Sequence, residues 1–301
     1  MTRRGQTRTT GRATAVPAVV GLDCAIAFQK IALVCVGRIE VHRGGACAGD
    51  AEAVHQIRVA ITRLRATASF FAPMTVDAEW RRLKPEIAWL NASLGAARDS
   101  DVMMEYVHRK RYRAWAVEML GPDIDAVQMR DRRRLVRCLR SRRFQGLIAA
   151  LSGWIEHGRW RLRWERNARH KPAEPLKAYS ERELHRWRRQ LIRKGRHLGA
   201  MNASRRHGLR IKVKRFRYMI EALTDTVPVF DRSDIRHVRK SAKKLQAVLG
   251  DLRDLRRFSK LRPSDGGDIS MSAPPGYRRK RDKLLGAAID AYRDLKQAGR
   301  C

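Results

Sequence analysis

Residues 55–71 read HQIRVAITRLRATASFF, and residues 207–223 read HGLRIKVKRFRYMIEAL. The second stretch repeats the order of the first 152 positions later. The matched pairs are His55/His207, Arg58/Arg210, Val59/Ile211, Ile61/Val213, Arg63/Arg215, Leu64/Phe216 and Arg65/Arg217. A second block, LGAARD at 94–99, returns as LGDLRD at 249–254, with three more residues in between. Insertions of this kind are tolerated in loops, so the two ordered blocks indicate an internal duplication.

Each copy of the first block has two distinct faces when drawn as a helix. The apolar positions follow the i, i+4, i+7 spacing of a buried stripe. In the first copy this stripe contains Ile57, Ile61, Leu64, Ala68 and Phe71. Another face carries His55, Arg58, Thr62 and Arg65, and in the second copy His207, Arg210, Lys214 and Arg217. One cationic group per turn, about every 5 Å, makes a track suited to a polyanion.

A run of charged residues is most often a solvated helix face, and this alternative has to be weighed. Two features favour a functional track. The basic positions repeat between the copies as faithfully as the apolar ones, and Glu221 is the only acidic residue in either stretch.

The two H-x-x-R motifs, together with LGAARD and LGDLRD, resemble the CHAD family, an α-helical domain named for its conserved histidines. The resemblance extends from about residue 18 to the last helix. It implies an all-α fold of two antiparallel four-helix bundles related by pseudo-two-fold symmetry. It also implies binding of inorganic polyphosphate in a central channel between the two motif helices.

Carried over position by position, the resemblance implies one set of polyphosphate contacts. The first-rank contacts are His55, Arg58, Arg65, His207, Arg210, Lys214 and Arg217, and the second-rank contacts are Arg63, Arg215, Arg98 and Arg253. One position departs from the family pattern, because Thr62 stands where the family has Arg or Lys and where the second copy has Lys214. The first half is therefore expected to hold phosphate less strongly, unless Arg63 compensates from the neighbouring face.

The composition favours an anionic partner. The 301 residues include 66 Lys and Arg against 30 Asp and Glu, a net charge of +36. Such a field attracts nucleic acid, polyphosphate or an anionic membrane. The most apolar stretch, 16–36, is interrupted by Asp23, Gln29 and Lys30, so we expect a core helix and no transmembrane segment. Five cysteines without C-x-x-C spacing indicate reduced thiols of a cytoplasmic protein.

The pattern is helical throughout, with breakers between amphipathic segments. We expect residues 1–15 to form a disordered basic tail and 16–301 one CHAD domain, with halves at about 16–165 and 177–300. Pro85 indicates that the third helix begins at that residue, near the start of the range 77–94. The other expected helices are 18–42, a motif helix capped by Asp50 and ending near Pro73, 124–152, 180–197, 204–223, 231 or 233 to 258, and 277–298.

Signatures of catalysis are missing from the sequence. It contains no G-x-x-x-x-G-K-[ST], H-E-x-x-H or G-x-S-x-G motif. His55 and His207 have no second ligand at i+3 or i+4, so neither a metal nor another cofactor is expected. Each has Arg at i+3, and we expect these histidines to take up protons when a polyanion binds, tightening binding as pH falls toward 6.

The resemblance, together with the missing catalytic motifs, therefore implies a non-enzymatic binder of polyphosphate, with association to polyphosphate granules as a compatible role. The alternative is sequence-nonspecific binding of nucleic acid through nonspecific electrostatics. Arg-rich segments at 130–143 and 159–166 would supply a separate surface for it. The seven tryptophans are scattered and none lies on the motif faces, so core packing is the expected role for them.

Overall fold

A computed structural model describes residues 23–107, 124–170, 175–226, 233–258 and 276–298. Within these ranges all regular structure is helical, which confirms the predicted all-α class. The predicted tail at 1–15 lies outside the described residues, as does Cys301. The helices are α1 (Cys24–Val41), α2 (Arg43–Cys47), α3 (Ala51–Phe70), α4 (Ala72–Thr75), α5 (Ala78–Val107), α7 (Ile124–Arg140), α8 (Arg142–His157), α9 (Arg159–His170), α10 (Leu176–Gly195), η1 (Leu198–Ala200), α11 (Ala203–Thr226), α12 (Ser233–Phe258) and α13 (Tyr277–Gln297).

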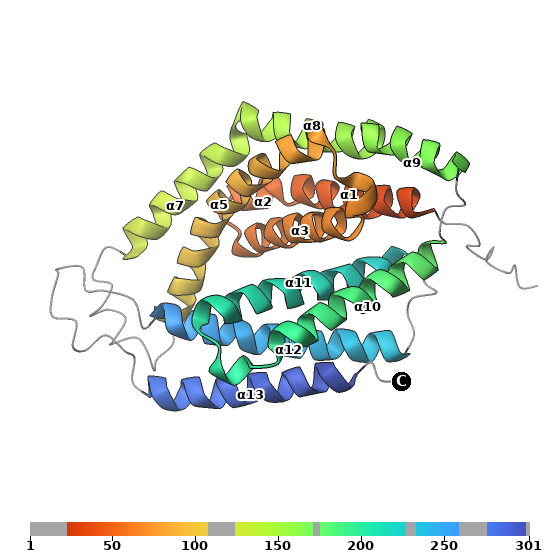
Figure 1. The fold of residues 1–301 in the computed structure, drawn as a ribbon. Helices are drawn as coiled ribbons and strands as arrows, with labels where there is room; N and C mark the ends of the chain where they lie inside the picture. The colour runs from red at the N-terminus through yellow and green to blue at the C-terminus, as the bar shows by residue number, and fades with distance from the viewer. Residues whose placement is uncertain (1–22, 108–123, 171–174, 227–232, 259–275, 299–301) are drawn as a thin grey trace, which may run out of the picture.

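The helices pack in two groups that meet at the two motif helices. In the first group α1, α3, α5, α7 and α8 contact one another, and in the second α10, α11, α12 and α13 do so. Helices α3 and α11 carry the repeated stretch, and they pack against each other across the middle of the molecule (Figure 1). A group of helices around α11 and another around α3 are the arrangement that a duplicated helical unit would give. The pseudo-two-fold relation between them stays a prediction.

The predicted apolar stripe is buried in both copies. Ile57, Ile61, Leu64, Ala68 and Phe71 are at most 1 % exposed, and the matched Leu209, Val213, Phe216, Ile220 and Leu223 are at most 3 % exposed. Each motif helix therefore turns this stripe toward the core of its own group. The remaining surface of α3 and α11 is left to face the other group and the solvent.

The beginning of α5 differs from the prediction. The helix begins at Ala78, and Pro85 lies inside it. The Asp77 side chain accepts a hydrogen bond from the Trp80 N–H at 2.7 Å, which satisfies a free donor of the first turn. A proline at position 85 leaves the Arg81 carbonyl without its helical partner, but both residues are exposed, so water can take its place. Asp50, by contrast, caps α3 as predicted, accepting from the Glu52 N–H at 2.8 Å.

Two further boundaries were predicted wrongly. The helix expected at 124–152 is split at Ser141, whose hydroxyl caps α8 by accepting from the Phe144 N–H at 3.1 Å. The helix expected from residue 180 already begins at Leu176, directly after Pro175. Ser180 and Glu183 are both buried inside it, and Glu183 binds Arg186 on the next turn. The serine and the glutamate three residues later therefore do not mark the start of this helix.

Aromatic rings fill the centre of the first group. Phe28 on α1 makes edge contacts with Phe71, Trp154 and Trp160, at centroid distances between 5.0 and 5.9 Å. The Trp160 indole also donates to the Trp154 carbonyl oxygen at 2.8 Å. Helix α1, from the most apolar stretch of the chain, is thus a core helix. Among the described residues, no helix is long and apolar enough to cross a membrane.

Candidate polyanion-binding site

Seven cationic or titratable side chains from four helices gather where the two groups meet. Helices α3 and α11 supply His55, Arg58, His207, Arg210 and Lys214, while α5 and α12 supply Arg98 and Arg253. We call these seven residues the basic cluster. Helix α3 packs on α5 and α11 packs on α12, so each motif helix aligns its basic face with the arginine of the LGxxRD block of its own half. All seven were predicted from the sequence as site residues.

The pKa of Lys214 shows how strongly positive charge is concentrated in the basic cluster. Burial is the main cause that lowers its pKa from 10.5 to about 7, followed by the positive charges of Arg210, Arg58, Arg217 and Arg253. Since Arg58 belongs to α3, the basic faces of the two motif helices act on the same point. Burial and the surrounding arginines disfavour the charged form of this lysine, and a bound anion would favour it.

Arg58 and Arg210 occupy equivalent places beside the two glycines of the LGxxRD blocks. A Cβ atom at Gly95 would stand 3.2 Å from Arg58 Nη1, and one at Gly250 would stand 3.7 Å from Arg210 Nε. Arg58 Nη1 and Arg210 Nε are both buried and lack a hydrogen-bond partner. Burial, above all other causes, lowers the pKa of each guanidinium. The glycines therefore make room for arginines that the protein itself leaves incompletely satisfied.

A few acidic residues adjoin the basic cluster. Asp99 on α5 reaches α12, where it lies 2.7 Å from Arg257 Nη1 and 3.8 Å from Arg253 Nη2. Arg98 is 3.2 Å from Glu105 on its own helix. Burial is the main cause that raises the pKa of Asp254, although Arg253 and Arg210 oppose it. Asp99 thus pairs with arginines of α12 at the junction of α5 and α12.

The two histidines differ in their surroundings. His55 is half-buried, and burial followed by Arg98, Lys214 and Arg58 lowers its pKa, while Glu52 raises it. His207 is exposed, and its pKa is lowered by partial desolvation and then by Arg253 and Arg210. Both imidazoles are therefore driven toward the neutral form in the unliganded protein, as the sequence predicted from their neighbouring arginines.

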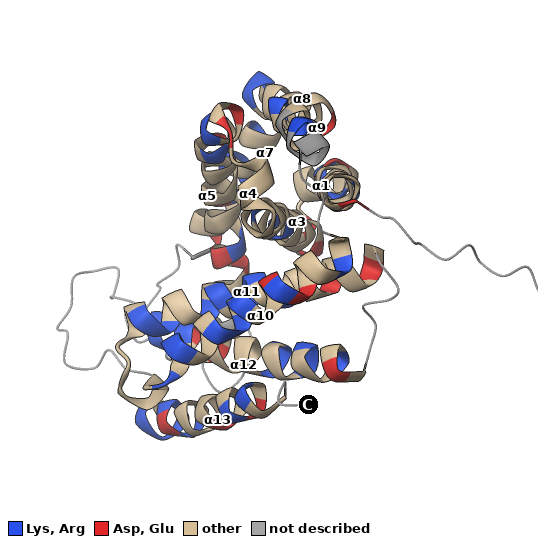
Figure 2. Cartoon of the chain, turned by 45° about the vertical axis from the view of Figure 1, so that its right-hand side comes forward, with Lys and Arg blue, Asp and Glu red and all other residues tan. Residues whose placement is uncertain are grey.

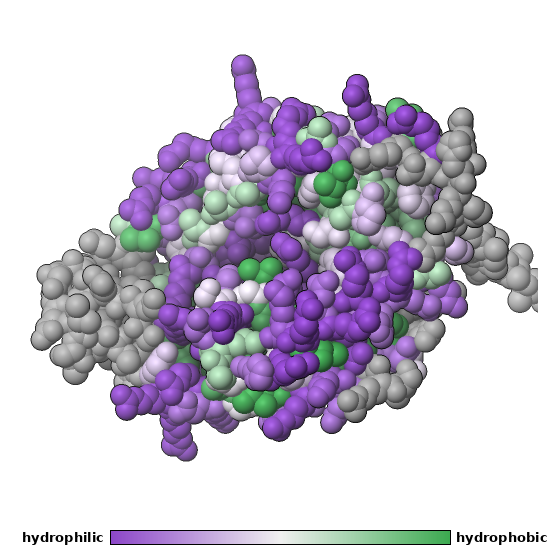
Figure 3. Space-filling model, in the orientation of Figure 1, coloured by the Kyte–Doolittle hydropathy of each residue, from purple (hydrophilic) through white to green (hydrophobic). Residues whose placement is uncertain are grey.

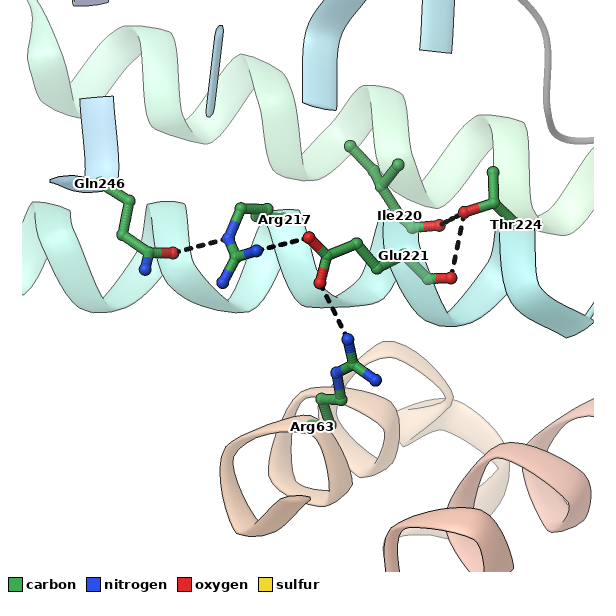
Figure 4. A network of polar contacts seen from close by, with 6 residues as sticks. All are labelled: Arg63, Arg217, Ile220, Glu221, Thr224 and Gln246. Carbon is green, nitrogen blue, oxygen red and sulfur yellow. Dashed lines mark hydrogen bonds and ion pairs between the residues drawn. The ribbon is translucent and has the colours of Figure 1, made fainter. Parts of the chain in front are cut away.

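Arg63 and Arg217 meet a carboxylate between the motif helices. Glu221 on α11 lies 3.0 Å from Arg63 Nη2 on α3 and also binds Arg217 Nη1 (Figure 4). The Arg217 Nε donates to Gln246 Oε1 at 2.9 Å, and its guanidinium stacks 4.3 Å from the Tyr218 ring centroid. The carboxylate neutralises part of both charges. Arg63 is thus turned toward Glu221, and its compensation for Thr62 in phosphate binding stays a prediction.

Thr62 leaves a gap in the cationic face of α3. Its hydroxyl donates to the Arg58 carbonyl oxygen at 2.8 Å, so it is satisfied within its own helix. Arg65 and Arg215 lie together elsewhere on the α3–α11 contact, since burial and then Arg65 lower the pKa of Arg215. Of the eleven predicted residues, the structure therefore brings seven into the basic cluster, two around Glu221 and two into a separate pair.

The outer surface is strongly polar. Hydrophilic side chains cover most of the face in Figure 3, and long basic stretches run along α10 and α11 in Figure 2. On α7, five exposed arginines belong to the predicted nucleic-acid surface: Arg130, Arg133, Arg134, Arg137 and Arg140. Of the other arginines in the range 130–143, Arg132 pairs with Asp101, and Arg143, on α8, pairs with Glu86 and covers Trp89.

Two participants were missed from the sequence. Arg257 is the nearest partner of Asp99, and Lys212 lies beside Arg215 in a pocket described below. Lys212 lies within the repeated stretch, so the sequence could have drawn attention to it. The pocket itself could not be predicted, because part of its lining comes from α10. Within the described ranges, no three His, Cys, Asp or Glu residues are grouped as a metal site would require.

Comparison with known proteins identifies related folds. The family model of the CHAD domain matches residues 30–262. The crystal structure of the CHAD domain from the plant Ricinus communis aligns with a TM-score of 0.71 and 23 % identity, covering 97 % of this chain and 98 % of that one. PptA from Streptomyces chartreusis aligns with a TM-score of 0.54 and 13 % identity, covering 92 % and 98 %. No curated protein matches the sequence.

Proposed function

This chain belongs to the CHAD domain family, and from that premise we propose that it binds inorganic polyphosphate, without catalysis, along the basic cluster. The observation that carries the proposal is the convergence of both motif helices on Lys214. Arginines from α3, α11 and α12 lower its pKa, and Arg58 and Arg210 each keep a buried nitrogen without a partner. A polyanion would relieve this repulsion and fill the missing hydrogen bonds.

The arrangement suits a linear polymer of phosphates. The cationic groups come from four helices and are spaced along two of them, so several consecutive phosphates could be contacted at once. We propose that His55, Arg58 and Arg98 act from one half, and that His207, Arg210, Lys214 and Arg253 act from the other. Arg63 and Arg217, held by Glu221, would make weaker contacts at the edge of the cluster.

A non-catalytic role fits the kinds of side chain present. Hydrolysis of a phosphoanhydride commonly uses carboxylates that hold a divalent metal ion. Asp99 is engaged with Arg253 and Arg257, and Glu221 with Arg63 and Arg217. We further expect the protein to accumulate where its ligand does, at polyphosphate granules in the cytoplasm, which co-sedimentation with isolated granules would test.

A competition experiment tests the proposal against nucleic-acid binding. Labelled long-chain polyphosphate is bound at about 0.15 M salt, where loose electrostatic binding weakens, and is displaced by unlabelled polyphosphate or duplex DNA. The cluster variant Arg58→Ala/Arg210→Ala is compared with the matched variant Arg133→Ala/Arg137→Ala on the exposed face of α7, which loses the same charge. Circular dichroism confirms that both remain helical.

We expect polyphosphate to displace the label at lower phosphate concentration than DNA does. The cluster variant should lose at least about tenfold in polyphosphate affinity, as two charge-assisted contacts would require, while the α7 variant changes it little. If DNA competes better, or if both variants lose equal affinity for both polymers, sequence-blind nucleic-acid binding replaces the proposal.

A further inference from the structure

The repeat places two versions of one contact between the motif helices. The 152-residue offset that pairs Arg63 with Arg215 and Arg65 with Arg217 also pairs Ser69 with Glu221. In one version Glu221 stands between Arg63 and Arg217, which come from opposite helices (Figure 4). The other version has two arginines from opposite helices as well, but a serine replaces the carboxylate.

The second version has no internal anion. Ser69 Oγ donates to the Arg65 carbonyl oxygen at 2.7 Å, so the hydroxyl is turned to its own helix. Arg65 lies close enough to Arg215 to lower the pKa of Arg215, after the larger effect of burial. Across the described part of the chain, neither Arg65 nor Arg215 forms an ion pair. Glu221 neutralises the positive charge at the first contact, whereas no carboxylate among the described residues neutralises the two arginines at the second contact.

A pocket opens at this second contact. Its volume is about 210 Å³, which is several times the share of liquid volume that one water molecule occupies. The lining residues are Ser69, Arg186, Trp187, Gln190, Leu191, Lys212, Arg215 and Phe216. Lys212 adds a second cation, and its pKa is lowered by burial, Lys194 and Arg215. Arg186 is already engaged by Glu183, so Arg215 and Lys212 supply the available charge.

We infer that this pocket binds a single phosphate group, which takes the place of the missing carboxylate beside Arg215. Arg215 and Lys212 would hold its oxygens, the Gln190 amide can donate a further hydrogen bond, and Trp187 and Phe216 form an apolar wall. The group can be inorganic phosphate or the phosphate of a small monoester. The inference is independent of polymer binding, because none of the lining residues belongs to the basic cluster.

Substitution at Ser69 tests this directly. Inorganic phosphate is titrated by calorimetry into the full chain at constant ionic strength, with glycerol phosphate as the monoester and chloride as the control. Ser69→Glu installs the carboxylate found at Glu221, while Ser69→Gln adds nearly the same volume without charge. Glu221→Ser makes the reciprocal change at the first contact.

We expect the unmodified chain to bind phosphate and Ser69→Glu to bind it at least tenfold more weakly, with a higher melting temperature when no ligand is present. Ser69→Gln should retain more affinity than Ser69→Glu, and Glu221→Ser should gain phosphate-dependent thermal stabilisation if it folds. If glycerol phosphate binds with the same affinity as inorganic phosphate, the site is open to monoesters. If glycerol phosphate binds more weakly, the site is specific for the free ion.

Equal phosphate binding by Ser69→Glu and the unmodified chain, or no binding by either, would overturn the inference. The polymer provides a separate readout. Polyphosphate affinity of Ser69→Glu should stay within about threefold, since one added charge outside the cluster is screened. A parallel tenfold loss of polymer affinity would instead make the pocket part of the polymer track, and the claim of a discrete site would fail.

Discussion

Lys214 should make polyphosphate binding depend on pH in a range where polymer phosphates and arginines keep their charge. Burial and the neighbouring Arg210, Arg58, Arg217 and Arg253 hold its pKa at about 7 in the free protein. Above that pH the amine is mostly neutral. A bound polyanion brings opposite charge and raises the pKa again, so binding takes up a proton.

The magnitude follows from the fraction of free protein that already carries the proton. A group with a pKa of about 7 is about 90 % charged at pH 6 and about 1 % charged at pH 9. If the polymer restores the pKa to about 10, the affinity falls about 80-fold between these pH values. If it restores the pKa only to about 8, the fall is about eightfold.

Stability of the ligand-free protein should change in the opposite direction. In the unfolded chain Lys214 returns to its ordinary pKa of 10.5, so the unfolded state binds more protons than the folded state between about pH 7 and 10.5. Lys214 therefore contributes a free energy of unfolding that rises with pH across this window. Affinity for polyphosphate falls across the same window, and this opposition separates the effect from general alkaline denaturation.

The assay is anisotropy of labelled long-chain polyphosphate from pH 6 to pH 9 at constant salt, with calorimetry in two buffers of different ionisation enthalpy to count protons. Lys214→Arg keeps its charge throughout and should give a nearly flat profile, while Lys214→Met should be flat and weak. Lys243→Arg, on the exposed surface of α12, should keep the dependence of the unmodified chain. A bound polyanion would also raise the pKa values of His55 and His207, which are lowered in the free protein, so the comparison with Lys214→Arg isolates the lysine. An affinity that changes less than twofold from pH 7 to pH 9, or a Lys214→Arg profile that matches the unmodified chain, would refute the reasoning.

Three further predictions address the scaffold of the site. Glu221→Gln leaves Arg63 and Arg217 without their carboxylate and should cost about 3 kcal/mol of unfolding free energy in chemical denaturation. Glu86→Gln, at the exposed Arg143 pair, should cost clearly less, and equal losses would contradict this. Gly95→Ala puts a Cβ 3.2 Å from Arg58 Nη1 and should weaken polyphosphate binding about tenfold, as measured by anisotropy. Gly250→Ala puts a Cβ 3.7 Å from Arg210 Nε and should weaken binding less. The reverse order would contradict the packing role of Gly95. Burial raises the pKa of Cys35 to about 12, so alkylation at pH 8 followed by mass spectrometry should label the partly exposed Cys47 and leave Cys35 unmodified.

The sequence predicted the parts of the fold that depend on local chemistry. The i, i+4, i+7 stripe of Ile57, Ile61 and Leu64 is buried because apolar spacing alone determines which side of a helix faces a core. Asp50 caps α3 because a short acidic side chain before a helix satisfies its free N–H groups. The predicted start of α5 was wrong because Pro85 lies inside the helix. Proline lacks the N–H that would bond to the Arg81 carbonyl, and this is tolerated because Arg81 is exposed to solvent.

The site was less predictable because its contacts join residues far apart in the sequence. The helical wheel places Arg63 and Arg65 on different faces of one helix. It cannot show that Glu221 lies opposite Arg63, or that Ser69 lies beside Arg215. Those partners depend on how α3 crosses α11. The low pKa of Lys214 has the same origin, since two of the arginines that cause it lie on α3 and α12.

The two treatments of positive charge at the α3–α11 contact bear on why the basic cluster stays open. Where Arg63 and Arg217 meet, one half-buried carboxylate bridges the helices and neutralises the contact. A carboxylate placed beside Lys214 would stabilise the free fold in the same way, but it would repel an incoming phosphate and occupy the nitrogens of Arg58 and Arg210. Leaving those nitrogens without partners costs stability in the free protein, and that cost is recovered only when an anion binds. The ligand therefore does at the cluster what Glu221 does at the neighbouring contact, and binding should raise the melting temperature of the unmodified chain more than that of Arg58→Ala/Arg210→Ala.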